Sequence, residues 1–212
     1  MPIAAAYLPV AFALGAASSR FGFSVIESAL WSLVMFSGAN QALMLSSVAS
    51  GVSLTVLALL CIAASLRHLL YGMVLRTHVF ARPLVRATFA YGLTDEVFAT
   101  ALTAANHRKG GLAGSWLVGL GMAALTVWVL GTALGNAAGD VLQTAFPGLS
   151  DTLDFALPAL FVALVQSTFQ RAIMVPMAAA ACLAVLMVAI GRPELAIPAG
   201  ALAAVLPARS EP

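Results

Sequence analysis

Long stretches without Asp, Glu, Lys, Arg or His dominate the pattern of this sequence. They cover residues 1–19, 28–66, 110–139, 155–170, 172–191 and 195–208. A helix needs about 20 mainly apolar residues to cross the hydrocarbon core of a bilayer. The 28–66 stretch accounts for most of two helices, about 24–46 and 53–75, separated at SSVASGVS (46–53). The pattern therefore predicts an all-α integral membrane protein.

A further apolar block, residues 87–106, is interrupted by the adjacent acids Asp95 and Glu96. Counting this block gives about seven to eight hydrophobic segments, of which the last is short and carries Pro198. Two interpretations of the block stay open. It crosses the membrane as a plain span, or it dips in and returns on the same side as a re-entrant segment.

The distribution of Lys and Arg in the loops favours the re-entrant interpretation. If the block is re-entrant, Arg192 lies opposite all the other loop cations, which are Arg20, Arg76, Arg82, Arg86, Arg108, Lys109, Arg171 and Arg209. If every segment crosses, the two sides carry nearly equal numbers and the orientation stays undecided. Cytoplasmic loops carry an excess of Lys and Arg, so we expect the region from Arg76 to Lys109 to be cytoplasmic.

The composition leaves no room for a soluble domain. Of the 212 residues, 62% are hydrophobic and 8% are charged, whereas soluble domains contain about 25% charged residues. The net charge of +2 comes from scattered residues, so a nucleic-acid-binding face is not expected. Cys61 and Cys182 lie in apolar runs, far from any metal-ligand spacing. We therefore expect a single polytopic membrane domain over residues 1–212.

A short internal echo indicates two repeat halves, about 1–106 and 110–208. Gly-Phe-Ser at 22–24 and Gly-Leu-Ser at 148–150 each open an apolar segment, and a further apolar segment follows each. Many secondary transporters are built from repeats of inverted topology. If three of the first four segments cross fully, the two halves would form such an inverted repeat.

Polar side chains at membrane depth are the informative positions, because a charge there costs at least about 2.5–3.5 kcal/mol. The first cluster is Ser37, Gly38, Asn40 and Gln41, inside the second segment. A break of the helix at Ser-Gly would expose backbone groups to a cavity, as in the midplane sites of transporters. Interhelical hydrogen bonding by the same side chains is the equally open alternative.

The second cluster lies towards the far end of the third segment. Arg67 and Tyr71 are four residues apart and share a helix face, and His68 can change charge near neutral pH. Arg67 is either part of a buried site or an anchor whose guanidinium reaches the headgroups.

The third cluster is Thr94, Asp95 and Glu96, with apolar residues on both sides. One acid would pair with Arg67, and the other would bind a proton near neutral pH in its low-dielectric surroundings. Protonatable carboxylates at membrane depth are typical of proton-coupled transport. A purely structural ion pair between helices is the alternative.

In this order and spacing, the clusters resemble motifs of the AzlC family, the large subunit of branched-chain amino-acid exporters. The resemblance covers nearly the whole chain. Its motifs are MFSGANQ at 35–41, LRHLLY at 66–71, TDE at 94–96, the helix with Trp128, Gly131 and Gly135, and DFALPA at 154–159. The sequence departs from the family at Ser65, where Asn is usual, and in its opening helix.

The resemblance implies export of branched-chain amino acids (Leu, Ile, Val), with methionine as a further candidate, across the bacterial inner membrane. It also implies a small AzlD-type membrane subunit as partner. The sequence has no Walker A loop, no His-Glu-x-x-His and no Cys pairs, so we expect a secondary carrier without metal or cofactor rather than an enzyme.

Under the leading hypothesis the chain exports its substrate at the expense of the proton-motive force. The expected substrate-binding residues are Ser37, Gly38, Asn40, Gln41, Arg67, Tyr71 and Thr94. Proton coupling is expected from His68, Asp95 and Glu96. Two alternatives from other classes stay open, namely an intramembrane hydrolase that uses His68 with one of the acids, and a non-transporting membrane scaffold subunit.

Overall fold

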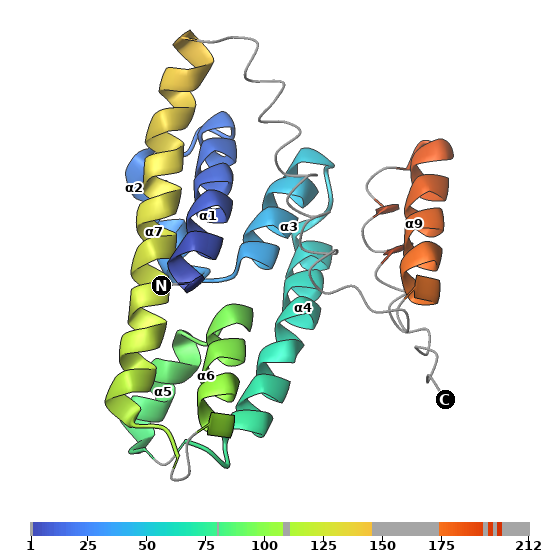
Figure 1. The fold of residues 1–212 in the computed structure, drawn as a ribbon. Helices are drawn as coiled ribbons and strands as arrows, with labels where there is room; N and C mark the ends of the chain where they lie inside the picture. Colours follow the sequence, from blue (N-terminus) through green and yellow to red (C-terminus); the bar gives the residue numbers. More distant parts are fainter. Residues whose placement is uncertain are drawn as a thin grey trace. The chain divides into compact units, whose positions relative to one another are not determined.

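The computed structural model describes residues 2–79, 81–107, 111–145, 174–192, 195–196 and 199–200. The helices in these ranges are α1 (Pro2–Arg20), α2 (Val25–Val34), α3 (Gly38–Ala49), α4 (Leu54–Leu75), α5 (Pro83–Tyr91), α6 (Asp95–His107), α7 (Gly114–Ala145) and α9 (Met174–Ala189) (Figure 1). The described chain contains no strand, which confirms the predicted all-α class.

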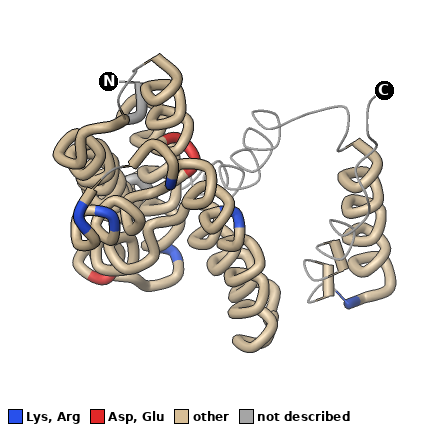
Figure 2. The backbone as a smooth tube through the Cα atoms, turned by 90° about the horizontal axis from the view of Figure 1, so that it is seen from below, with Lys and Arg blue, Asp and Glu red and all other residues tan. Residues whose placement is uncertain are grey.

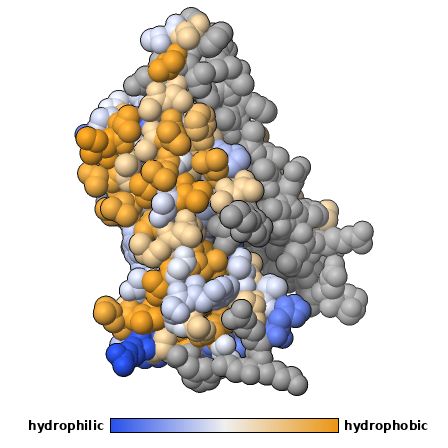
Figure 3. All heavy atoms as spheres, turned by 60° about the vertical axis from the view of Figure 1, so that its left-hand side comes forward, coloured by the Kyte–Doolittle hydropathy of each residue, from blue (hydrophilic) through white to orange (hydrophobic). Residues whose placement is uncertain are grey.

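Two of these helices are long and apolar enough to cross a bilayer. They are α4 over Leu54–Leu75 and the Gly114–Gly139 part of α7. Apolar side chains such as Leu59, Leu66 and Leu69 are exposed on α4, as expected of a surface that faces lipid rather than water. Figure 3 shows apolar residues over much of the face of the described chain that is turned to the viewer, and Figure 2 shows how few charged residues lie along the described backbone.

The described helices form two compact units. The first holds α1, α2, α5, α6 and α7 with the first turn of α3 and the Ala64–Leu75 part of α4, and the second holds the rest of α3 and α4 with α9. In the second unit, α9 ends where Gly191 adopts φ +74°, and the amide of Arg192 donates to the carbonyl of Met187 at 2.9 Å. This turn is a usual C-terminal end of a helix and matches the predicted 172–191 segment.

In the first unit, α1 packs lengthwise against α7 along a stripe of glycines. A Cβ on Gly131 would lie 2.8 Å from the Cβ of Ala11, and one on Gly139 would lie 3.1 Å from the Cα of Ala16. The residue numbers of the contacting positions increase in the same direction along both helices, so α1 and α7 run parallel. The four-residue glycine spacing therefore brings two helices into close contact and does not line a pore.

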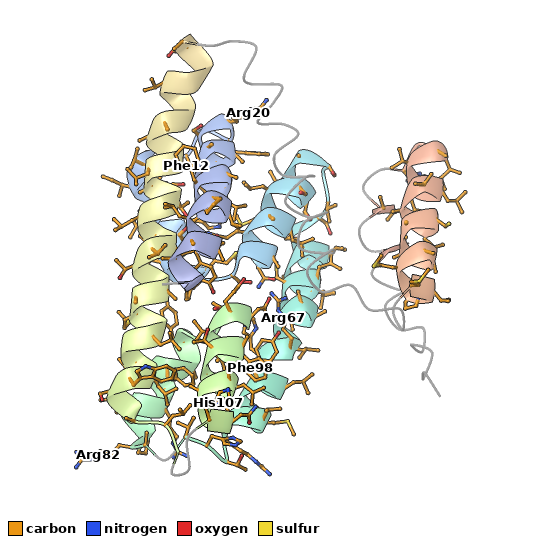
Figure 4. The ribbon with its side chains drawn as sticks, in the orientation of Figure 1. Phe12, Arg20, Arg67, Arg82, Phe98 and His107 are labelled. Carbon is orange, nitrogen blue, oxygen red and sulfur yellow. The ribbon has the colours of Figure 1, made fainter. Side chains whose placement is uncertain are left out.

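The α5–α6 pair is a hairpin that enters and leaves at one end of the first unit. The amide of Leu112, after α6, donates to the carbonyl of His78, before α5, at 3.0 Å. Arg82 and His107, which flank the hairpin, lie at the same end in Figure 4. The chain therefore breaks before Asp95 and turns back, as the re-entrant interpretation of residues 87–106 requires, while the side of the membrane on which the hairpin begins and ends stays a prediction.

The hairpin reaches deep along α7. Val85 of α5 lies against Gly114 at the start of α7, whereas Gly92 at the end of α5 lies against Gly121. With a rise of about 1.5 Å per residue, α5 therefore follows α7 for about 10 Å before the chain turns.

The expectation that Arg20 shares a face with Arg82 is wrong. Ser19 lies against Gly139, near the far end of the α7 span, whereas Ala81 lies against Gly114 at its start. These two glycines are about 38 Å apart along a helix axis, and Figure 4 shows Arg20 and Arg82 at opposite ends. The reason is that the predicted 24–46 span is also broken, into α2 and α3, and therefore is not a plain crossing.

Several predictions of the sequence lie outside the described residues. These are the 155–170 segment, most of the 195–208 segment, the Gly-Leu-Ser echo at 148–150, the DFALPA motif, and Arg108 with Lys109. The proposed repeat halves and the single domain over residues 1–212 therefore stay predictions.

Candidate functional site

The first helix break lies at Met35–Ser37, between α2 and α3. The amide of Met35 closes α2 by donating to the carbonyl of Trp31 at 2.8 Å, and the amide of Gln41 opens α3 by donating to the carbonyl of Ser37 at 2.9 Å. Gly38 is required at this point because a Cβ there would lie 2.7 Å from the indole ring of Trp128. The predicted break at Ser-Gly is therefore present.

Gln41 closes a ring of hydrogen bonds that joins α2, α3 and α7. Trp128 Nε1 donates to Gln41 Oε1 at 2.9 Å, and Gln41 Nε2 donates to Ser32 Oγ at 2.8 Å. Ser32 Oγ donates to Thr132 Oγ1 at 2.9 Å, which in turn donates to the carbonyl of Trp128 at 2.8 Å. All four side chains are buried. This ring ties the end of α2 and the start of α3 to the middle of α7.

Asn40 lies beside this ring but is only partly satisfied. Its Nδ2 donates to Ser65 Oγ at 2.8 Å, and its backbone amide lies 3.5 Å from Ser37 Oγ. Asn40 is only 8% exposed, and its Oδ1 atom is buried without a hydrogen-bond partner. A buried acceptor left open is costly unless a ligand or water completes it.

The second helix break lies at Gly92–Thr94, between α5 and α6. Thr94 caps α6: its carbonyl accepts from the amide of Phe98 at 2.8 Å, and its hydroxyl accepts from the amide of Val97 at 3.4 Å. Asp95 and Glu96 are consequently the first two residues of α6, where the helix dipole favours negative charge.

Asp95 pairs with the second cluster, on α4. Arg67 Nη1 lies 2.9 Å from Asp95 Oδ2, and the hydroxyl of Tyr71 donates to Asp95 Oδ1 at 2.7 Å. The ring of Tyr71 stacks on Phe98 with centroids 4.3 Å apart, and Arg67 points from α4 toward α6 in Figure 4. The side-chain Nε of Arg67 is buried without a partner. The predicted pairing of Arg67 with one of the two acids is therefore formed.

His68 lies on the edge of this arrangement. Its Nδ1 is 3.0 Å from the carbonyl of Ser65, and its ring meets that of Tyr71 edge to face with centroids 5.7 Å apart. Through Tyr71 it is therefore two contacts away from Asp95.

Glu96 has a different set of contacts from its neighbour. Its Oε2 accepts a hydrogen bond of 2.8 Å from the hydroxyl of Tyr7 on α1. The same hydroxyl also hydrogen-bonds Thr94. Within the described chain the salt bridge at this site is that of Arg67 with Asp95, so Glu96 is held by a neutral partner. The two adjacent acids are thus in unlike environments.

Tyr7 is the site residue that the sequence analysis missed. Its ring meets Trp128 with centroids 5.2 Å apart and Phe36, in the first break, at 6.3 Å. Tyr7, Phe36 and Trp128 form what we call the aromatic cluster. The signal was a hydroxyl within an apolar opening segment, but nothing local to residue 7 indicates a partner 87 or 89 positions away.

The two helix breaks therefore adjoin at the aromatic cluster. Tyr7 touches Phe36 of the first break and Thr94 of the second, and the hydroxyl of Tyr91, at the end of α5, donates to the carbonyl of Leu33, at the end of α2. Trp128 is about 21 Å along α7 from Gly114, so the meeting point lies deep within the span. Four helix ends, an ion pair and a second carboxylate are gathered there.

Comparison with known proteins gives a consistent identification. The AzlC protein family matches residues 2–142. The chain is 39% identical over 175 residues to "Inner membrane protein YgaZ" of Escherichia coli (strain K12), covering 81% of this chain and 71% of the relative. It is 36% identical over 164 residues to an uncharacterized membrane protein of Archaeoglobus fulgidus, covering 77% and 69%. No solved structure matches the chain. Since the family match spans most of the sequence, the chain belongs to the AzlC family of membrane proteins.

Proposed function

We propose that this chain is a secondary transporter that exports branched-chain amino acids across the inner membrane and is driven by the proton-motive force. The observation that carries the proposal is the meeting of two helix breaks deep in the span, with an Arg–Asp pair and a separate carboxylate beside them. Broken helices at the midplane are how many secondary transporters expose backbone groups to a substrate. Membership of the AzlC family supports a role in membrane transport rather than catalysis.

The open hydrogen-bonding atoms suit an amino-acid zwitterion. Asn40 offers an unpaired acceptor, Oδ1, and Arg67 an unpaired donor, Nε. An α-amino acid brings an ammonium donor and a carboxylate acceptor, and so would complete both. Ser37 and Gly38 at the start of α3, together with Thr94 and Tyr71, complete the set of proposed contacts. Gln41, whose amide is held in the buried ring, would act by holding α3 in place.

The unlike environments of the two acids support different roles for them. With Arg67 and both acids ionised, the cluster carries one net negative charge in a low-dielectric site, and protonating one acid removes it. Asp95 has a cation and a phenol as partners, whereas Glu96 has a phenol. Glu96 is therefore the proposed proton carrier, Asp95 the partner of Arg67, and His68 a group that tunes this pair.

The proposal extends to location and assembly. The Escherichia coli relative is named an inner membrane protein, which supports an inner-membrane location for this chain. The two helices that are long and apolar enough to cross a bilayer support a multi-pass placement. A small AzlD-type membrane subunit is the proposed partner. Co-expression of this chain with such a subunit, followed by affinity purification in mild detergent, would show a stable complex if the partnership exists.

Purified protein in liposomes tests the function directly. Vesicles loaded with labelled leucine should release it faster when the outside is made more acidic than the inside, and a protonophore should remove the acceleration. Empty vesicles and valine-loaded vesicles provide the background and the substrate comparison. If an imposed pH gradient leaves leucine efflux unchanged, with and without the small subunit, the proposed function is wrong.

A further inference from the structure

Tyr7 connects the second carboxylate to the first helix break. Its hydroxyl binds Glu96 and Thr94 at the second break, while its ring packs on Phe36 and Trp128. Tyr7 thus contacts the first break through its ring and the second break through its hydroxyl. The hydroxyl and the ring are parts of one rigid group, so any change at Glu96 that moves the hydroxyl also moves the ring.

The aromatic cluster fills the space between the two breaks. Tyr7, Phe36 and Trp128 are 3%, 8% and 4% exposed, and the three rings meet edge to face. Trp128 is fixed on its other side by its hydrogen bond to Gln41 and by Gly38. Closely packed side chains have discrete arrangements rather than continuous ones, so displacement of the Tyr7 ring would require the cluster to repack.

We propose that Tyr7 is a positioning residue that couples the protonation of Glu96 to the packing of the aromatic cluster between the two helix breaks. The inference rests on the proposed function, in which Glu96 carries the proton. When Glu96 is ionised, it is an acceptor and Tyr7 donates to it. When Glu96 is protonated, it becomes a donor, the Tyr7 oxygen accepts from it, and the Tyr7 proton turns to another acceptor, for which Thr94 is in place.

The other ionisable groups around Glu96 come from two helices. Asp95 precedes it on α6, and α4 brings Arg67 and Tyr71, which contact Asp95, and His68, which contacts Tyr71. The Gly114–Gly139 part of α7, against which α6 packs, contains no Asp, Glu, Lys, Arg, His or Tyr. Within the described chain, Tyr7 is thus the titratable side chain in direct hydrogen-bond contact with Glu96.

The fluorescence of Trp128 can test this coupling without any substrate. Replacing Trp31 and Trp116 by Phe in the full chain leaves Trp128 as the remaining tryptophan, since the sequence has three. We expect its emission in detergent to change with pH. The change should disappear in Glu96→Gln, and Tyr7→Phe, which keeps the ring and removes the hydroxyl, should also abolish it. Thr103→Val removes an exposed α6 hydroxyl that bonds only the carbonyl of Ala99 in the contacts described, and it should titrate like the parent.

Transport provides the second arm of the test. Tyr7→Phe should retain leucine–leucine exchange, while efflux driven by a pH gradient falls at least tenfold. Thr94→Val removes the second partner of the Tyr7 hydroxyl, and it should reduce the pH-dependent emission change that Tyr7→Phe abolishes. The inference is overturned if Trp128 emission titrates with the same midpoint and amplitude in Tyr7→Phe, or does not titrate in the parent. A different outcome separates the two proposals. If the emission change depends on Tyr7 and Glu96 but the chain transports no leucine, the proposed function is wrong and the coupling by Tyr7 is supported.

Discussion

At the scale of single residues, the site contains one cation, Arg67, and two adjacent carboxylates, of which Asp95 pairs with it. Arg67 faces Asp95 at 2.9 Å, and Glu96 is the next residue along α6. A nearby cation favours the ionised form of a carboxylate, and its loss favours the protonated form. Under the proposed function, removal of the Arg67 charge is therefore expected to change the pH dependence of efflux.

Arg67→Ala should move the pH of half-maximal efflux upward. Without the guanidinium the acids hold a proton more tightly, so a higher pH is needed to release it. Arg67→Lys keeps the charge but loses the planar donor group, and it should retain part of the activity with a smaller shift. Efflux measured from pH 5.5 to 8.5 in liposomes checks both. An unchanged pH profile in Arg67→Ala would mean that Arg67 is only an anchor.

Replacement of Gln41 should lower the stability of the folded protein. Gln41→Ala leaves the buried Trp128 Nε1 without its acceptor, and an orphaned buried donor costs about 1–3 kcal/mol. Thermal unfolding in detergent should therefore begin at a lower temperature. Thr126→Ala is the matched control, because that exposed hydroxyl bonds the carbonyl of Met122 on its own helix and should change little. Equal unfolding of Gln41→Ala and the parent would show that the ring contributes nothing.

At the scale of helices, the α1–α7 contact depends on glycine. A Cβ on Gly135 would lie 2.8 Å from the Cα of Phe12, in the backbone of α1, whereas a Cβ on Gly119 of the same helix would have nothing within 4 Å. Gly135→Ala should lower stability by about 1–3 kcal/mol, because backbone cannot move aside as a side chain can. Gly119→Ala should leave stability unchanged or raise it. SDS-induced unfolding of both variants makes the comparison, and equal stability would contradict the packing described.

The α5–α6 hairpin makes a prediction about sidedness. In a background without Cys61 and Cys182, single cysteines at Arg82 and His107 should be labelled by an impermeant thiol reagent from the same side of the membrane. A cysteine at Arg20 should be labelled from the opposite side, since Arg20 lies at the other end of α7. Labelling of Arg82 and His107 from different sides would show that the hairpin crosses.

Local sequence determined the helix breaks, and this is why they were predictable. Ser37-Gly38 lies at the start of α3 and Gly92 directly follows α5, and the adjacent acids mark the start of α6. The local sequence does not determine how far each segment extends across the membrane. The 24–46 segment has the length and composition of a plain span, so its division into α2 and α3 changed the side on which Arg20 lies.

Long-range partners account for what the sequence did not predict in the site. Pairing of Arg67 with an acid followed from charge, since a membrane site with one cation and two anions favours it. The assignment of Asp95 rather than Glu96 to that pair depends on how α4 and α6 face each other. Tyr7 and the hydrogen-bond ring of Gln41 depend on how α1 and α7 pack, and neither leaves a pattern within one segment.

At the scale of the whole molecule, three structural features meet at the site. Two broken helices bring their ends together, an ion pair fixes one carboxylate, and Tyr7 holds the other against the aromatic cluster. Under the proposed function, proton release and substrate release would share one place in this arrangement, near the broken helices where many secondary transporters bind their substrates. The central claim is that Glu96, rather than Asp95, carries the proton.

Leucine transport by Glu96→Gln in liposomes tests this claim most directly. The amide mimics the protonated acid and cannot release a proton, so we predict that leucine–leucine exchange persists while the response to a pH gradient is lost. Asp95→Asn is the comparison, and it should weaken exchange and gradient-driven efflux together, because it leaves Arg67 without its partner. Efflux by Glu96→Gln that still follows the pH gradient would contradict the account.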